Sequence, residues 1–423
     1  MWPREQKVKS TAISFNIYVF ICFACLLLQL VWSQYFQINN FGGLFAVGSD
    51  LPATVPNNRF KPIVGEHFFG DLLDGSVNFP KLPSGSYFGP SYLFFWLTSG
   101  VSYRIVFILF FSLALLLCAF SLRRWLSLVL EENKGMVYAL HFSYPFLFAA
   151  DRGQMNLLTG YLTAIGLSYL VTSTTSTKDG SWGQAILGIA FSVKAYPVFT
   201  AIALEKFWSI KKWRSMIVSY FVFCCSTPLV FMLLGGSLSA LNTKEQLYLR
   251  EDYFIRTLYQ NTSLKALLYH FQRISIDQIA RIFEIMFLNY SVFYILYALF
   301  FAILLKSRFL DIQEKLLAFA ILSISVVPIA PVYSQTLVCA VALISLTDIK
   351  VGSKKRQKLI WFVVLISTVP VNIPIIIERN SGPETFYQSL VVPLVQHSYV
   401  VILGVIVLYD FFKPQSFKVV GDS

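Results

Sequence analysis

The chain has 423 residues, of which 56% are hydrophobic and only 13% are charged, and its mean hydropathy is +0.63. A soluble domain carries about 25% charged residues, so this composition excludes an ordinary soluble enzyme. A net charge of +12 would suit a nucleic-acid-binding protein, but its placement along the chain fits a membrane topology, and we expect no nucleic-acid partner.

Apolar runs recur along the chain, several of them near the ~20 residues that one membrane-crossing helix needs. The first, residues 12–32, follows a basic N-terminus, but no small-residue cleavage site comes after it, so we interpret it as a retained span. The polar segment 33–90 follows, and residues 91–100 are apolar but too short to span the membrane. The other apolar runs are 103–122, 136–150, 157–172, 182–208, 215–234, 282–305, 315–330, 332–346, 359–377 and 391–412.

The run 182–208 has Lys194 and Pro197 in its middle. A lysine at the centre of a spanning helix costs about 2.5–3.5 kcal/mol, and proline interrupts the hydrogen-bond ladder. The alternative to one span is a short hairpin that folds back at Lys194–Pro197. The hairpin places the basic clusters at 211–214 and 354–356 on the inner side, as the positive-inside rule requires, so we prefer it.

The prediction is therefore an all-α, polytopic transmembrane protein of about twelve membrane segments, including the hairpin. It forms a single domain, 1–423, with both termini cytoplasmic. The outer side receives a first loop, 33–100, the stretch Asp151–Asn156, and a second large segment, 235–281. Lys194 and residues 333–335 reach the same side.

This outer side directs the choice of chemistry. No extramembrane segment is long enough for a nucleotide-binding α/β domain, and the sequence has no P-loop or GxGxxG motif. An enzyme of this kind would take its activated substrate from the membrane, which favours glycosyl transfer from a lipid phosphate. An inverting transfer needs one carboxylate base, and the departing phosphate needs cationic or amide donors.

Asp50 and Asp71 are the candidate bases, although a solvated carboxylate is the ordinary interpretation of an aspartate in a polar loop. Arg152 and Lys194 are the candidate phosphate-binding residues, and Arg152 would equally well extend to lipid headgroups. We interpret Asp151 as a cap of the following helix.

We expect no metal and no other cofactor. The four histidines, 67, 141, 270 and 397, are dispersed, and the six cysteines lie in apolar runs without metal-binding spacing. Arginine and lysine can neutralise a leaving phosphate without a metal ion.

Two neighbouring motifs resemble those of the GT87 (DUF2029) family of polytopic glycosyltransferases. Arg152–Asn156 and Gly188–Pro197 are similar to the family pair RGQ-x-N and GxxxxxK-x-x-P. Weaker similarities lie at Tyr87–Pro90, Asn261–Leu264 and Ala330–Gln335. The last of these lacks the histidine that the family carries there, so no role of that histidine is transferred to this chain.

The resemblance implies a GT-C fold and a multi-pass protein of the bacterial inner (plasma) membrane. It implies transfer of a hexose, in particular mannose, from a polyprenyl-phosphate donor to a lipid-linked or glycan acceptor. It also places the catalytic carboxylate in the first outer loop, where both Asp71 and Asp50 match. We prefer Asp71 slightly, because its aromatic neighbours would hold it at the membrane surface. The expected substrate-binding residues are Gln154, Asn156, Asn261, Ser263, Tyr333 and Gln335.

Two other functions remain open. A transporter or flippase of a lipid-linked saccharide would share the broken helix at Lys194–Pro197, because half-helix termini also bind anionic substrates in transporters. The sequence shows no internal repeat in its support. The third possibility is an inactive scaffold subunit of an envelope-glycan assembly.

Overall fold

The computed structural model describes thirteen stretches of the chain, with gaps between them. The described residues are 15–35, 103–152, 154–172, 177–194, 214–222, 263–274, 277–307, 310–325, 332–347, 354–369, 373–379, 382–388 and 391–412. The candidate residues Asp50, Asp71 and Asn261 lie outside them, as do the first outer loop and most of the segment 235–281.

Helices account for nearly all of the described part. They are α1 (Phe15–Tyr35), α4 (Tyr103–Leu128), η2 (Glu131–Asn133), α5 (Lys134–His141), α6 (Tyr144–Arg152), α7 (Asn156–Thr172), α8 (Thr177–Val193), α12 (Leu264–Ile274), α13 (Asp277–Leu288), α14 (Tyr290–Lys306), α15 (Ile312–Ser325), η5 (Val332–Gln335), α16 (Thr336–Ala342), η6 (Leu343–Leu346), α17 (Lys354–Thr368) and α18 (Val391–Phe412). Residues 214–222 are also helical.

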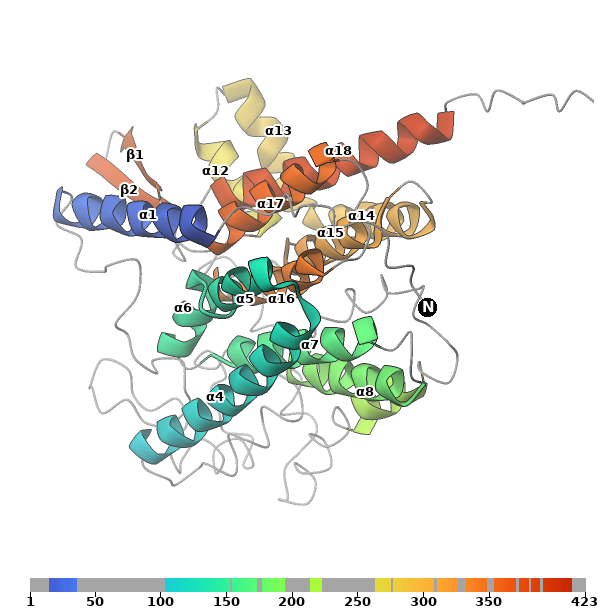
Figure 1. Ribbon diagram of the computed structural model, residues 1–423. Helices are drawn as coiled ribbons and strands as arrows, with labels where there is room; N and C mark the ends of the chain where they lie inside the picture. Colours follow the sequence, from blue (N-terminus) through green and yellow to red (C-terminus); the bar gives the residue numbers. More distant parts are fainter. Residues whose placement is uncertain are drawn as a thin grey trace, which may run out of the picture.

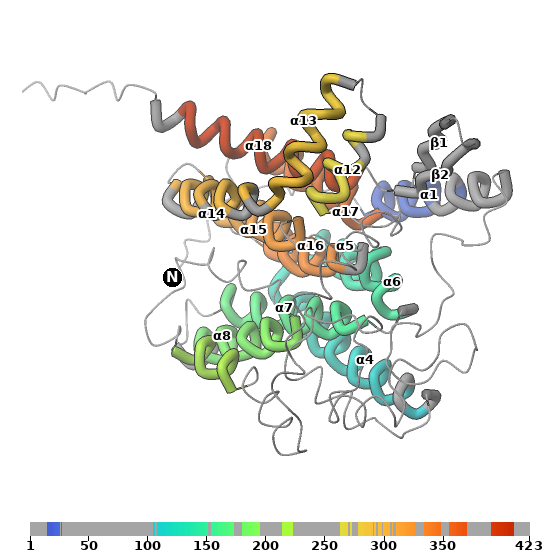
Figure 2. Tube along the Cα trace, turned by 180° about the vertical axis from the view of Figure 1, so that it is seen from behind, coloured from blue at the N-terminus to red at the C-terminus, as the bar shows by residue number. Residues whose placement is uncertain are grey.

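The centre of the bundle is α16, in which every residue is buried. It packs against α7 on one side and against α15 and α17 on the other. Figure 1 shows α4, α7 and α8 in one group of helices and α14, α15, α17 and α18 in another, and Figure 2 shows the same arrangement from behind. Residues near α16 therefore connect the two groups.

The outward surface of this bundle is strongly apolar. Leu116 on α4, Ile295 on α14 and Val401 on α18 are between 60% and 69% exposed. Within the described residues, Ile108–Leu128 and Val391–Tyr409 are long and apolar enough to cross a membrane. Exposed apolar surface of this extent fits contact with lipid rather than with water.

The apolar run 136–150 is interrupted, whereas the sequence pattern predicts one helix. Pro145 lies at the second position of α6 and has no N–H to donate to the carbonyl of His141, four residues earlier. The Tyr161 hydroxyl donates to that carbonyl instead, at 3.3 Å. The His141 carbonyl thus has a hydrogen-bond donor although the helix is interrupted between α5 and α6.

The all-α prediction is wrong at one place, the end of the run 359–377. There α17 ends at Thr368, and Ile373–Arg379 forms strand β1, which pairs antiparallel with β2, Gly382–Gln388. Prolines at positions 370 and 374 cannot donate to a helical ladder, and the isoleucines between 373 and 377 favour extended backbone.

A second predicted span, 282–305, begins earlier than expected and is divided. Helix α13 ends at Leu288, and α14 begins at Tyr290. Asn289 lies between them, and its side-chain amide donates to the Ile285 carbonyl at 2.9 Å. The asparagine thus satisfies a carbonyl at the end of α13, which is the local contact that accompanies the break.

The helix of residues 214–222 lies beside α8. The Ser215 hydroxyl donates to the Ser181 carbonyl at 3.1 Å, so residue 215 lies beside the first half of α8. Further along, a Cβ on Gly188 would approach the Met216 carbonyl oxygen to 2.6 Å, so the helix 214–222 packs directly on α8. Residue 215 therefore lies near the end of α8 away from Lys194. Residues 195–213, which the hairpin prediction concerns, lie outside the described part.

Candidate functional site

The site begins in the short connection between α6 and α7. Helix α6 ends at Arg152 and α7 begins at Asn156. The backbone N–H of Gln154 donates to the Ala149 carbonyl at 2.8 Å, which closes the end of α6. Gln154, Met155 and Asn156 are all buried, so this polar connection lies inside the protein rather than on its surface.

Asn156 joins three segments at the start of α7. Its side-chain oxygen accepts a hydrogen bond from the Lys194 ammonium, and its side-chain nitrogen donates to the Ser334 hydroxyl at 3.3 Å. Its backbone carbonyl accepts from the Thr336 hydroxyl at 3.2 Å. We call Lys194, Asn156 and Ser334 the lysine cluster. The distribution of basic residues predicted that Lys194 and Asn156 lie at the same end of the bundle. In the structure the two side chains are in contact.

Lys194 directly follows α8, and its side chain is only 3% exposed. Its backbone N–H donates to the Ala190 carbonyl at 3.1 Å, which continues the hydrogen bonding of the helix. Phe191 and Val193, in the last turn of α8, are also buried. An ammonium group among apolar side chains is costly unless it is hydrogen-bonded, and the neutral Asn156 amide is one of the partners of Lys194.

A second set of buried polar residues lies next to the lysine cluster. The side-chain nitrogen of Gln396 donates to the Gln335 side-chain oxygen at 2.6 Å and to the Ser367 hydroxyl at 2.8 Å. The exposed fraction is zero for Gln335 and Gln396 and 2% for Ser367. We call Gln335, Gln396 and Ser367 the amide cluster. Because Ser334 and Gln335 are adjacent in η5, the two clusters form one polar level that crosses the bundle.

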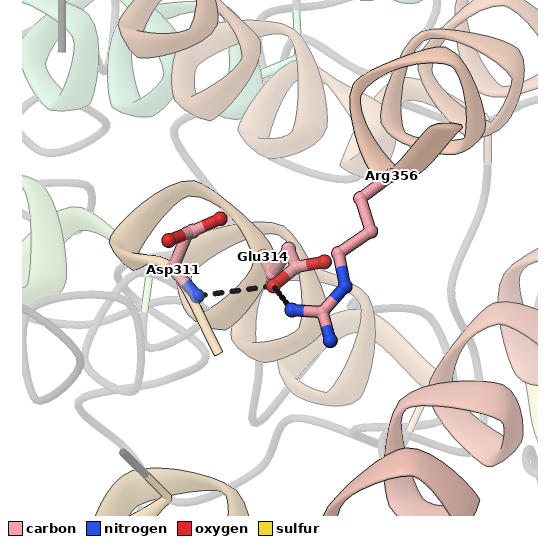
Figure 3. A network of polar contacts seen from close by, with 3 residues as sticks. All are labelled: Asp311, Glu314 and Arg356. Carbon is pink, nitrogen blue, oxygen red and sulfur yellow. Dashed lines mark hydrogen bonds and ion pairs between the residues drawn. The ribbon is translucent and has the colours of Figure 1, made fainter. Parts of the chain in front are cut away.

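The far end of the bundle carries a different polar group, which we call the arginine cluster: Asp311, Glu314 and Arg356. Glu314 lies in the first turn of α15 and accepts from the Asp311 backbone N–H at 3.0 Å. The same carboxylate oxygen pairs with the Arg356 guanidinium of α17 at 3.4 Å. Figure 3 shows Glu314 between these two partners.

Nearby contacts confirm that the arginine cluster lies away from the lysine cluster. The side chain of Gln313, beside Glu314, donates to the Ile344 carbonyl at 3.4 Å. Ile344 lies ten positions after Ser334 along the rod formed by η5, α16 and η6. At 1.5 Å per residue this separation is about 15 Å, so the two polar levels are distinct.

The other predicted site residues have separate positions. Ser263 caps α12, since its hydroxyl accepts from the Ala266 backbone N–H at 3.1 Å, and this contact provides a structural reason for the serine. Arg152 is the last residue of α6, and Tyr333 lies in η5. The prediction that Asp151 caps α7 is wrong, because Asp151 lies inside the last turn of α6 and α7 begins at Asn156.

Sequence reasoning missed Gln396, Ser367 and Thr336. A signal for Gln396 was present, because it is an uncharged polar residue within the apolar run 391–412. Its partner Gln335 lies 61 positions away, so the pairing required the fold. In the part of the chain that the structure describes, no three His, Cys, Asp or Glu side chains gather as a metal site would need.

Comparison with known families decides the identity at the level of family. A model described as "Glycosyltransferase family 87" matches residues 87–334, which is more than half of the chain. This protein belongs to glycosyltransferase family 87. The match contains the whole lysine cluster and ends at Ser334, so the amide cluster lies beyond it. Neither the curated proteins nor the solved structures gave a significant match.

Membership of family 87 makes the chain a membrane glycosyltransferase, with a sugar donor and an acceptor as its substrates. The motif pair at Arg152–Asn156 and Gly188–Pro197, on which the resemblance rested, lies inside the matched region. The apolar outer surface of the helices agrees with a membrane location.

Proposed function

We propose that this glycosyltransferase moves a hexose, in the first place mannose, from a polyprenyl-phosphate donor to a lipid-linked or glycan acceptor. The proposed site faces the extracytoplasmic side of a bacterial inner membrane. The proposed topology has a GT-C arrangement of about twelve membrane segments with both termini cytoplasmic. The observation that supports this proposal most strongly is the buried ammonium of Lys194, held by Asn156 at the start of α7.

A buried lysine needs a reason beyond packing. Replacing a buried charged group by an apolar residue of similar volume is often neutral or stabilising, so packing alone does not favour a lysine at this position. The Asn156 amide is neutral, so the hydrogen bond to it does not itself cancel the positive charge of the ammonium. That charge would attract an anionic group delivered from the membrane, and a lipid phosphate is such a group. Lys194 also directly follows α8, near the family motif that contains Arg152.

The proposed reaction is an inverting displacement. Asp71 or Asp50 takes the proton from the acceptor hydroxyl, whose oxygen forms a bond to the anomeric carbon of the sugar. The bond from that carbon to the phosphate oxygen breaks, and the polyprenyl phosphate leaves with the electron pair. Arg152 and Lys194 neutralise the phosphate, and no metal is assigned to this role.

The remaining polar residues would orient the donor and the acceptor. Within the described part, Asn156 and Gln335 belong to the two polar clusters, and Gln154 is buried beside Asn156. Ser263 has a capping contact, so its proposed role in substrate binding is secondary to that contact. The remaining assignments, Asn261 and Tyr333, rest on the sequence motifs.

The test is a transfer assay with purified protein, synthetic polyprenyl-phosphate hexoses and an acceptor extract. Loss of a general base costs about 100- to 10,000-fold in rate, so either Asp71→Asn or Asp50→Asn should lose transfer to that extent. Asp74→Asn, in the same loop, is the matched control and should remain active. Unchanged transfer in both variants would remove the carboxylate assignment. Movement of the lipid across liposomes without sugar transfer would favour a flippase instead.

A further inference from the structure

The junction between η5 and α16 is held from two opposite directions. Ser334 and Thr336 both contact Asn156 of α7, through the Ser334 hydroxyl at 3.3 Å and the Thr336 hydroxyl at 3.2 Å. Gln335, between them, bonds instead to Gln396 of α18. Three consecutive residues thus connect the lysine cluster to a helix on the other side of the bundle. Any rotation of this junction would disturb both contacts together.

Gln396 holds Gln335 in one orientation. Both N–H groups of the Gln396 side chain are used, one on the Gln335 oxygen at 2.6 Å and one on the Ser367 oxygen at 2.8 Å. The Ser367 hydroxyl in turn donates to the Val363 carbonyl at 2.7 Å. This chain of contacts runs from the backbone of α17 through α18 to η5, and each donor has a defined acceptor. A primary amide with a fixed acceptor cannot exchange its oxygen and nitrogen ends without losing these bonds.

A purely structural explanation accounts poorly for such an arrangement. Buried amide pairs in a helical bundle contribute little net stability compared with well-packed apolar side chains. Gln313, at the arginine-cluster end, gives a comparison: it is also buried, but it bonds to the Ile344 backbone carbonyl beyond the end of α16. In the described part, the side chain of Gln396 instead bonds to other side chains, at the level of the lysine cluster.

We infer that Gln396 is a positioning residue of the donor site. With Ser367 it fixes the Gln335 amide and the η5–α16 junction. It thereby sets the position of Ser334, which accepts a hydrogen bond from the Asn156 amide that bonds to Lys194. The inference rests on the proposed function of the lysine cluster. It extends the site to α17 and α18, which lie outside the region matched by the family.

The test measures steady-state transfer with a polyprenyl-phosphate hexose donor in the wild type and in Gln396→Met, which keeps the length of the side chain. A positioning role predicts that KM for the donor rises about ten-fold while kcat changes less, because a fixed group is lost from the binding site. A structural role would instead lower the active fraction, and thus the apparent kcat, at constant KM. Gln313→Met is the matched control and should leave KM unchanged.

Two further variants keep the inference testable if Gln396→Met folds poorly. Ser367→Ala removes one contact of Gln396 and should raise KM about three-fold, within the usual contribution of a single hydrogen bond. Gln396→Met introduced into a Gln335→Met background should add no further rise in KM, since the effect passes through Gln335.

The possible results distinguish failure of the inference about Gln396 from failure of the proposed function. A donor KM that stays at the wild-type value in Gln396→Met and Ser367→Ala overturns the inference while the proposed function stands. A rise in KM no larger than that of Gln313→Met would also overturn the inference while the proposed function stands. A wild-type protein that neither transfers sugar from the polyprenyl-phosphate hexose nor binds it overturns the proposed function, and the inference with it.

Discussion

The two ends of the helical bundle use buried polar residues in different ways. At the arginine-cluster end, side chains satisfy backbone groups or pair charge with charge: Glu314 accepts from the Asp311 N–H and pairs with Arg356, and Asn133 donates to the Leu346 carbonyl. At the opposite end, the contacts of the lysine and amide clusters run mainly from side chain to side chain across several helices.

This difference between the two ends distinguishes polar groups that stabilise the fold from polar groups proposed to bind the substrate. Polar groups that cap a helix or complete an ion pair meet a requirement of the fold itself. The hydrogen bonds from Lys194 to Asn156 and from Gln396 to Gln335 instead connect side chains of different segments. We therefore assign the arginine cluster to holding α15 against α17, and we propose that the lysine and amide clusters bind the substrate. Labelling and mutation at the two ends can test this division.

The two ends should lie on opposite sides of the membrane. A cysteine at Ser353, before α17, should be protected from an impermeant thiol reagent in intact cells, and a cysteine at Ser381, between β1 and β2, should be labelled. The expected contrast is all-or-none, because the reagent does not cross the bilayer. Labelling after permeabilisation is the control for reactivity. The reverse pattern would move the lysine cluster to the cytoplasmic side.

Asn156→Ala should lower transfer activity strongly and thermal stability only moderately. It removes one acceptor for Lys194 and the donor to Ser334, so kcat/KM for the sugar donor should fall about 10- to 100-fold, as expected when a buried charged group loses a hydrogen-bond partner. Thermal unfolding in detergent should show only a moderate decrease in Tm. A variant with unchanged kcat/KM would show that Asn156 does not organise the site.

Arg356→Met should have the opposite profile. The Glu314 carboxylate would lose its cationic partner in a buried position, which lowers the free energy of unfolding by about 1–3 kcal/mol. The fraction that remains folded should transfer sugar with the wild-type KM. The measurement pairs a thermal unfolding curve with the transfer assay, and a raised donor KM would contradict the division between the two ends.

Ser334→Ala should have the smallest effect. Its hydroxyl accepts from Asn156 at 3.3 Å, while the bond from Asn156 to Lys194 is preserved in the variant. A loss of about two- to five-fold in kcat/KM is expected for one long hydrogen bond. An effect as large as that of Asn156→Ala would mean that Ser334 contacts the substrate itself.

Much of this arrangement could be predicted from local sequence signals. Lys194 with Pro197 inside an apolar run predicted a helix that ends at Val193, which is where α8 ends. The distribution of basic residues predicted that Lys194 and Asn156 share one end. The contact between these two side chains confirms that part. The family motif at Arg152–Asn156 was sufficient to suggest the family that the match then showed.

Other features depended on contacts between distant residues. The end of α17 could have been placed earlier, because prolines at 370 and 374 oppose a helix there. The role of Gln396 could not, because a single glutamine in an apolar helix gives no indication of which neighbour it meets. The prediction that Asp151 caps α7 was wrong for a related reason. Helix α6 continues past Asp151 to Arg152, so the turn comes two residues later than expected.

The most direct test of the account is the affinity of the purified protein for a polyprenyl phosphate, compared between wild type, Lys194→Met and Arg356→Met. A charge-assisted hydrogen bond to phosphate contributes about 1.5–3 kcal/mol, so Lys194→Met should bind about 10- to 100-fold more weakly, with little change in Tm. Arg356→Met should bind as tightly as the wild type. Equal affinity of Lys194→Met and the wild type would contradict the assignment of Lys194 to the donor phosphate.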